Sequence, residues 1–97
     1  MNEVSYEERT LAYKTALLMY GKSNQLVVAL EELSEVQKEI CKAMRGNTNL
    51  DHLAEEIADA TIMLEQVRLI YGLNNLVCQK MDEKIKRLVD RMMGGRA

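Results

Sequence analysis

Proline is absent from this chain of 97 residues, and glycine interrupts it at only four points. Because proline breaks helices more strongly than any other residue, helices are free to run from one glycine to the next. The core has to be aliphatic, since the chain has seven methionines and no phenylalanine or tryptophan. The sequence therefore predicts one all-α domain over residues 1–97, a four-helix bundle. The expected helices run from Ser5 to Tyr20, from a cap at Ser23 or Asn24 to Gly46, from Asn49 or Asp51 to Gly72, and from a cap at Asn74 or Asn75 to Gly94–Gly95.

Apolar residues return to one side of the second and third expected helices, which advance about 100° per residue. These two stripes are expected to pack on each other, and the short connections favour antiparallel neighbours. The first helix carries Leu11 and Leu18 opposite its main apolar face, which indicates a helix buried between subunits of an oligomer. The two stripes consist of Leu26, Leu30, Leu33, Ile40 and Met44, and of Leu53, Ile57, Ala60, Leu64, Val67 and Tyr71.

Charge is unevenly distributed along the chain, although the net charge is only −2. Binding to DNA or RNA is not expected, because nucleic acid backbones are bound chiefly by clustered lysine and arginine. Residues 31–65 carry nine acids and three bases, whereas residues 80–97 carry three acids and six bases, among them Arg96. An acidic middle and a basic end are suited to act together on a metal-bound polyanion, and ordinary solvated helix faces produce the same asymmetry.

The sequence offers no other obvious metal site and no obvious targeting signal. Cys41, Cys78 and the single His52 are too few for a structural zinc site, and both cysteines are expected to be buried free thiols. The first nine residues lack the basic-then-apolar order of a signal peptide, and no apolar run is long enough to span a membrane. We therefore expect a soluble, cytoplasmic protein.

Acidic pairs at a spacing of three residues occur on both central helices. Glu32 with Glu35, and Glu56 with Asp59, each project from neighbouring points on one helix surface. Like charges at this spacing repel, and their position at the edge of the apolar stripes predicts that they are partly buried. Such a group requires a compensating cation, and Mg²⁺ is the expected one because it prefers carboxylate oxygen.

Two neighbouring acids fall outside this set. Glu31 and Glu39 are expected to face solvent. The alternative for either segment alone is a plain solvated helix face, because glutamate is a strong helix former. The presence of both segments in one chain favours the metal site.

The same residues resemble a known family. Glu31-Glu32-x-x-Glu35 followed by Glu56-x-x-Asp59 is similar to the signature of the MazG-like branch of the all-α nucleoside triphosphate pyrophosphohydrolases. The flanking Gln25-Leu26, Ala29-Leu30 and Ala58-Asp59-Ala60 agree, and the resemblance covers roughly Gln25 to Arg91.

The resemblance implies a four-helix core, assembly into dimers or tetramers, and Mg²⁺ that is often replaceable by Mn²⁺. It also implies hydrolysis of nucleoside or deoxynucleoside triphosphates to monophosphate and pyrophosphate, a nucleotide-pool housekeeping activity. Carried over by position, Glu32, Glu35, Glu56 and Asp59 would be metal ligands, with Glu31 in support.

A basic ridge is expected on the last helix, where Lys80, Lys84, Arg87 and Arg91 fall within a sector of about 60°. These cations are suited to contact a triphosphate, and Lys80-Met81 followed by Arg87 is similar to the C-terminal pattern of the family. Lys84 departs from that pattern, because many members have asparagine there. The alternative is that the four residues only complement the helix dipole and keep the protein soluble.

The resulting hypothesis is metal-assisted attack of water on phosphorus, with Glu35 orienting the water and Lys80 and Arg87 stabilising the departing pyrophosphate. Two other functions stay open: phosphoribosyl-ATP pyrophosphohydrolase, and a non-catalytic helical dimerisation or adaptor protein. His52 is interpreted as a surface residue. Tyr13, Tyr20 and Gln25 are candidates for a nucleobase pocket, and core packing or capping explains them equally well.

Overall fold

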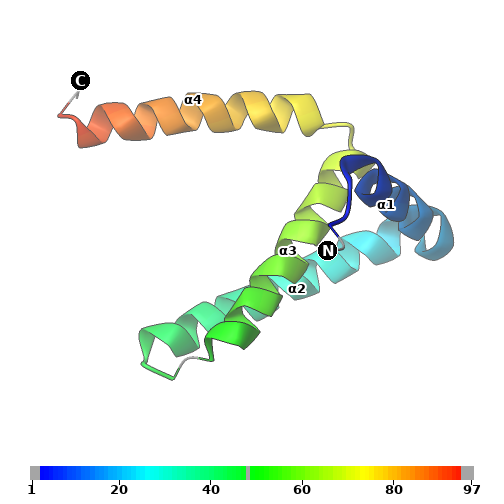
Figure 1. The fold of residues 1–97 in the computed structure, drawn as a ribbon, viewed down its shortest axis with the longest axis horizontal. Coiled ribbons are helices and arrows are strands. Elements are labelled where there is room, and N and C mark those ends of the chain that lie inside the picture. The colour runs from blue at the N-terminus through cyan, green and yellow to red at the C-terminus, as the bar shows by residue number, and fades with distance from the viewer. Residues whose placement is uncertain (1–2, 48, 95–97) are drawn as a thin grey trace.

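The computed structural model describes residues 3–47 and 49–94 and consists of four α-helices joined by short turns (Figure 1). The prediction of an all-α chain with four helices is confirmed. Gly95 and Arg96, which the sequence prediction included, lie outside the described residues. The helices are α1 (Tyr6–Tyr20), α2 (Lys22–Met44), α3 (Leu50–Ile70) and α4 (Asn74–Met92).

Two of the helices start where the sequence predicted, and each has a side-chain cap at that point. The hydroxyl of Ser5 accepts from the backbone N–H of Glu8, whose carboxylate accepts from the N–H of Ser5 in return, so a capping box begins α1. Asn49 caps α3 by accepting from the N–H of His52.

The other two predicted caps are wrong. Gly21, at φ 87°, donates to Leu17 and accepts from Gln25, so one residue ends α1 and starts α2. Ser23 and Asn24 are therefore already inside α2. The carbonyl of Leu73 accepts from the N–H of Val77, so α4 likewise starts before a side-chain cap at Asn74 or Asn75 is possible.

Helices α2 and α3 form an antiparallel hairpin, as predicted (Figure 1). Its interior is small: Ala29, Ala60 and Met63 are the apolar residues buried within the described part of the chain. A buried hydrogen bond of 2.7 Å runs from Gln25 Nε2 to Gln66 Oε1 and links the two helices. Two alanines, one methionine and a hydrogen-bonded amide pair therefore form the buried centre of the hairpin.

The prediction that the two leucine-rich stripes pack on each other holds only in part: Ala60 of the α3 stripe is buried, whereas several other members of both stripes are exposed. Helix α2 meets α3 through the face that carries Gln25, Ala29 and Glu39. Leu33, four residues after Ala29, borders that face and is partly buried, whereas Met44 lies about 100° around the helix from Gln25 and is exposed. Leu30 and Leu64 are 67% and 46% exposed, so much of each stripe faces outward. The residues buried in this contact are Gln25, Ala29 and Glu39 on α2 and Ala60, Met63 and Gln66 on α3.

Helix α1 is tied to α3 by polar contacts. The hydroxyl of Tyr13 donates a hydrogen bond to Glu65, and Arg9 lies 3.7 Å from the same carboxylate. Burial, followed by the hydrogen bond and negative charge of Glu65, raises the pKa of Tyr13 to about 12. No described residue of α1 is buried, and Leu11 and Leu18 are exposed.

Helix α4 leaves the C-terminal end of α3 and projects away from the hairpin (Figure 1). The radius of gyration is 16.6 Å, whereas a compact domain of this length has about 12.5 Å. The expected antiparallel packing of α4 on α3 is therefore absent from the described part of the chain.

Two further sequence predictions are tested by the fold. Cys41 and Cys78 are free, as predicted, but both are exposed, so the prediction of burial is wrong. Among the described helices, none combines the length and apolarity that a membrane crossing requires.

Candidate metal centre

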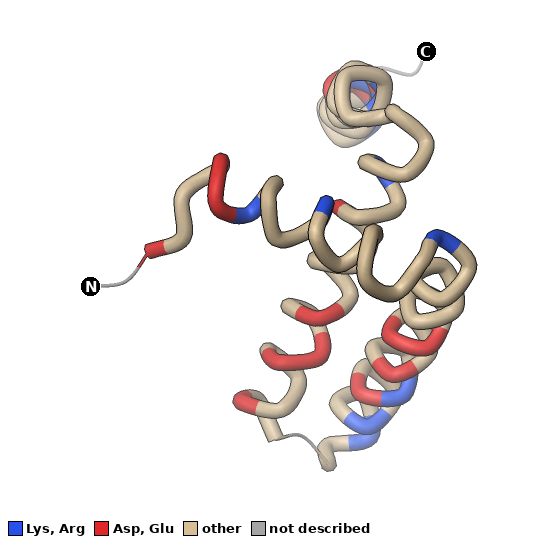
Figure 2. The backbone as a smooth tube through the Cα atoms, turned by 90° about the vertical axis from the view of Figure 1, so that its right-hand side faces the viewer, with Lys and Arg blue, Asp and Glu red and all other residues tan. Residues whose placement is uncertain are grey.

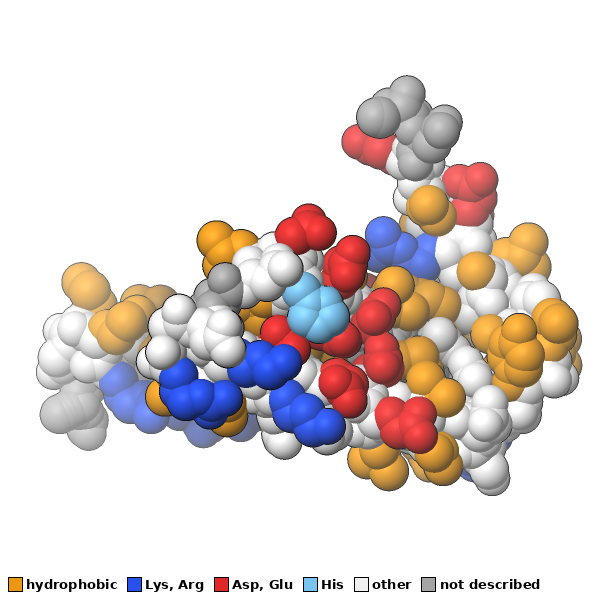
Figure 3. Space-filling view, turned by 90° about the horizontal axis from the view of Figure 1, so that it is seen from below, with side chains coloured by type: hydrophobic (Ala, Val, Ile, Leu, Met, Phe, Trp, Pro, Cys, Tyr) orange, Lys and Arg blue, Asp and Glu red, His pale blue; other side chains and the backbone are white. Residues whose placement is uncertain are grey.

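The hairpin brings together acidic side chains from α2 and α3. Glu32, Glu56 and Asp59 each offer a carboxylate oxygen, and the three oxygens lie within 4.8 Å of one another. Figure 2 shows the acidic residues of the two helices on successive turns of the hairpin. On the surface, the acidic side chains gather around the single histidine (Figure 3). We call these three residues the acidic cluster.

Burial differs among the three members of the acidic cluster. Glu32 and Glu56 are partly buried, as predicted, whereas Asp59 is exposed, which the prediction of partial burial missed. Asp59 lies three residues after Glu56, so its side chain projects from the next turn toward the rim of the hairpin. The cluster is thus open to solvent on one side.

Both burial and neighbouring negative charge act on Glu32. Partial burial is the largest cause that raises the pKa of Glu32 above its ordinary value, followed by the negative charge and hydrogen bonding of Asp59. Glu56 and Glu35 add repulsion. The ionised form of Glu32 is therefore disfavoured in the folded protein without a cation.

Glu35 and Glu31 lie outside the acidic cluster. Glu35 is on the next turn of α2 after Glu32, is about half exposed, and pairs with Lys38 Nζ at 3.5 Å. Glu31 is exposed, as predicted. Of the four predicted metal ligands, three are brought together and the fourth lies beside them.

Glu39 is buried, so the prediction that it faces solvent is wrong. Its side chain is only 7% exposed and lies 3.2 Å from Lys42 Nζ and 3.4 Å from His52 Nε2. His52 Nε2 is also 3.9 Å from Glu56, so this half-exposed histidine, predicted as a surface residue, links Glu39 to the cluster. The sequence contained the signal, because Glu39 is seven residues after Glu32 and returns to the same side of the helix.

The basic ridge is not brought to the acidic cluster within the chain. Lys80, Lys84, Arg87 and Arg91 are exposed on α4, which projects away from the hairpin. The ion pair that the structure gives for this ridge joins Lys80 to Glu83 on the same helix at 3.8 Å. The proximity of acidic and basic segments that we expected from the sequence is not present in a single chain.

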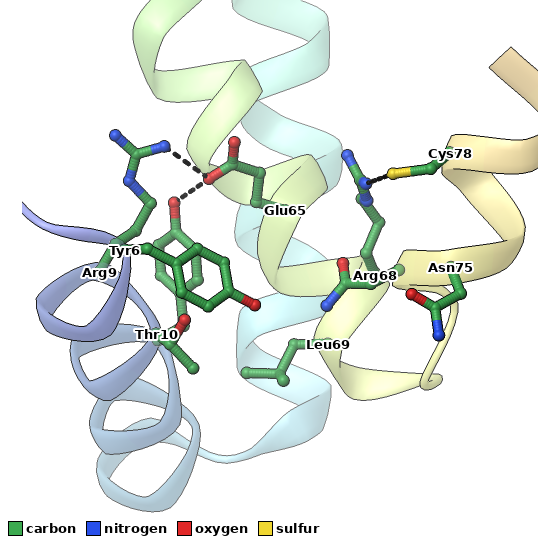
Figure 4. A pocket seen from close by; sticks show the side chains of 10 residues that line it. Tyr6, Arg9, Thr10, Glu65, Arg68, Leu69, Asn75 and Cys78 are labelled. Atoms are coloured by element: carbon green, nitrogen blue, oxygen red, sulfur yellow. Dashed lines mark hydrogen bonds and ion pairs between the residues drawn. The ribbon is translucent and has the colours of Figure 1, made fainter. Parts of the chain in front are cut away.

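A separate cavity of about 310 Å³ lies where α1, α3 and α4 meet (Figure 4). Tyr13 lines it, and Arg68 crosses it to place Nη2 3.4 Å from the sulfur of Cys78. The Nε atom of Arg68 is buried and has no hydrogen-bond partner among the described residues. Of the other two candidates for a nucleobase pocket, Tyr20 is exposed and Gln25 is bonded to Gln66 in the hairpin interior.

Comparisons with known proteins do not place the chain in a family. No protein-family model matches the sequence, and no curated protein or solved structure is significantly similar to it. The resemblance to the MazG-like proteins therefore rests on the motif residues alone.

Replacement of Glu32 by Gln is expected to stabilise the metal-free protein and to weaken its response to Mg²⁺. Removal of one like charge should raise the melting temperature in EDTA by roughly 1–4 °C, because such neighbours cost a few tenths of a kcal/mol. The gain should shrink as the pH falls toward the raised pKa of Glu32, where the wild-type carboxyl is also neutral. Thermal unfolding with EDTA or Mg²⁺ measures both effects.

Glu55→Gln is the matched control, because the Glu55 side chain is 69% exposed and its contact at 3.7 Å is with His52 and not with a member of the acidic cluster. It should leave the response to Mg²⁺ unchanged. A Glu32→Gln variant that melts lower than wild type in EDTA and gains as much from Mg²⁺ would contradict the repulsion assigned to this site.

Proposed function

We propose that this protein is a Mg²⁺-dependent pyrophosphohydrolase that converts nucleoside or deoxynucleoside triphosphates to monophosphates and pyrophosphate. The observation that carries the proposal is the meeting of Glu32, Glu56 and Asp59 within 4.8 Å across two helices. Three carboxylates from the two motif segments converge, although each segment alone has the composition of a solvated helix face. The proposed reaction is taken from the resemblance of the two acidic motifs to the MazG-like proteins.

The donor set fits Mg²⁺. Carboxylate oxygens are its preferred protein ligands, and the open side at Asp59 leaves room for the waters that Mg²⁺ retains and for a phosphate. When bound, the ion would supply Lewis acidity and lower the pKa of a coordinated water. Glu32, Glu56 and Asp59 would hold it. Glu35, one turn along α2, would accept a hydrogen bond from the attacking water.

Oligomeric assembly, as a dimer or tetramer, belongs to the proposal, and so does a phosphate-binding role for the basic ridge. Lys80 and Arg87 are the principal residues of this role, with Lys84 and Arg91 beside them. Since α4 projects from the hairpin, the arrangement within one chain supports the metal part of the proposal more directly than the phosphate part. The role of the ridge stays a prediction.

Pyrophosphate release from a panel of nucleotides, with Mg²⁺ or with EDTA, tests the function. The expected result is Mg²⁺-dependent release of equal amounts of pyrophosphate and monophosphate from at least one common nucleoside triphosphate. Hydrolysis of phosphoribosyl-ATP alone would favour the related enzyme. The absence of hydrolysis together with the absence of any Mg²⁺-induced rise in melting temperature would favour a non-catalytic adaptor.

A further inference from the structure

The described chain exposes more surface than a monomer of its mass should. Its accessible area is 7648 Å², whereas a folded monomer of this mass has about 5,700 Å². The excess is roughly 2,000 Å². Much of it is apolar, because α1 and α4 contribute no buried residue and the hairpin interior is small.

Exposed apolar side chains lie along one side of both helices of the hairpin. Because α2 and α3 run antiparallel, the outward rotation of both stripes carries them to the same side, and the rotation of Glu35 and Asp59 carries these acids to the other side. The hairpin therefore has an acidic face and an apolar face. We define the hairpin face by the exposed residues Leu30, Ile40, Met44, Ile57 and Leu64.

A second apolar surface runs along α4. The α4 stripe consists of Val77, Met81, Ile85, Leu88 and Met92, and the last four are exposed. From Val77 to Met92 the stripe advances 15 residues along the helix axis, a length of about 22 Å. From Leu30 to Met44 the hairpin face advances 14 residues along α2, a length of about 21 Å. The two surfaces match in length and chemistry.

The α4 helix cannot cover the hairpin face of its own chain in the observed arrangement. It departs from the end of α3 and projects outward (Figure 1). The side-chain contact that the structure gives between α3 and α4 lies near the start of α4, where Arg68 meets Cys78. An amphipathic helix of 19 residues with this little support requires a partner surface.

We propose that two copies of this chain exchange their α4 helices, so that the α4 stripe of each copy packs on the hairpin face of the other. A two-fold axis lets both contacts form at once, because each copy supplies one α4 stripe and one hairpin face. Removal of the excess surface from both chains would bury about 4,000 Å² in total, which is in the range of obligate homodimers. The exchange does not depend on hydrolysis, since it rests on apolar surface alone.

Single substitutions test the two halves of this interface. Ile85→Glu on the α4 stripe and Leu64→Glu on the hairpin face should each raise the dimer dissociation constant at least about thirtyfold, because each places a charge in an apolar contact. Val27→Glu is the matched control: Val27 is 52% exposed on α2 but lies outside the hairpin face. Sedimentation velocity of the full-length chain measures the mass, and wild type and Val27→Glu should be dimers.

Mixing the two variants tests the exchange itself. In a mixed dimer, the altered α4 stripe of the Ile85→Glu chain meets the altered hairpin face of the Leu64→Glu chain. The second contact joins an unaltered α4 stripe to an unaltered hairpin face. Refolding the variants together should therefore restore dimers that neither forms alone, and this also shows that both chains can fold. Circular dichroism of each variant monitors helix content.

Four results would overturn the proposal. A monomeric wild type at micromolar concentration would show that α4 folds back or stays free. A dimeric Ile85→Glu would indicate contact between hairpins alone, and a dimeric Leu64→Glu would indicate contact between α4 helices alone. The absence of mixed dimers would contradict exchange even if both single variants were monomeric.

Discussion

Replacement of Asp59 by Asn is expected to reduce Mg²⁺-dependent pyrophosphate release at least about a hundredfold. The substitution keeps the shape of the side chain and removes one of the three oxygen donors that converge in the acidic cluster. Loss of a residue that only supports a metal ligand costs roughly 10- to 100-fold, so loss of a ligand should cost more. Initial rates at saturating nucleotide and several Mg²⁺ concentrations measure the effect.

The matched control for Asp59→Asn is again Glu55→Gln, which removes an exposed carboxylate from the same helix outside the cluster. Its rate should stay within about twofold of wild type, because surface substitutions away from a site have small effects. Asp59 is exposed, so Asp59→Asn should also retain the wild-type helix content. Equal rates for Asp59→Asn and wild type would exclude Asp59 as a metal ligand.

Glu35→Gln should separate the roles of water orientation and metal binding. Glu35 is not one of the three converging carboxylates and pairs with Lys38. If Glu35 orients the attacking water, its replacement should lower the rate while most of the Mg²⁺-induced rise in melting temperature is kept. If it is instead a fourth metal ligand, rate and stabilisation should fall together.

The sequence predicted the helices well because the signals for them are local. The Ser5–Glu8 capping box, the Asn49 cap and the absence of proline act within one or two turns of the chain. The caps at Ser23 and Asn74 were wrong because Gly21 and Leu73 already serve as the starting residues of α2 and α4. One residue can end one helix and begin the next, and side-chain preferences alone do not reveal this.

The orientation of the helices was harder to predict. Apolar periodicity identifies which side of a helix avoids water, and it does not identify which neighbour covers that side. Leu30 and Leu64 were assigned to the α2–α3 contact, but a polar face with small residues forms that contact. The same error placed Glu39 toward solvent. Interfaces between copies follow the same hydrophobic rule as the core, so a single sequence does not distinguish them.

The candidate site was predictable to the extent that it depends on spacing. Glu56 and Asp59 are three residues apart on α3, and Glu32 occupies the facing turn of α2. The His52–Glu39 contact depends on how the ends of the hairpin meet, and the position of the basic ridge depends on the direction in which α4 leaves the turn at Gly72. These features follow from long-range geometry, which residue spacing does not encode.

Replacement of Gln25 alone by Met is expected to destabilise the fold by about 1–3 kcal/mol. Gln25 and Gln66 are both buried, and the 2.7 Å hydrogen bond between them joins α2 to α3. Methionine has nearly the shape of glutamine, so the substitution leaves little cavity but removes the donor to Gln66 Oε1. A buried acceptor without a partner costs roughly this amount. Urea denaturation at one fixed protein concentration measures the change and holds any subunit association constant.

The double variant Gln25→Met/Gln66→Met should regain most of the stability that the single variant loses. When both partners become apolar, no buried polar atom of the pair is left unsatisfied, and exchange of this kind is often close to neutral. The coupling between the two sites should therefore be about 1 kcal/mol or more in a double-mutant cycle. Additive losses would mean that the two amides act independently. They would also mean that the polar face of the hairpin is held by Ala29, Ala60 and Met63 rather than by this hydrogen bond.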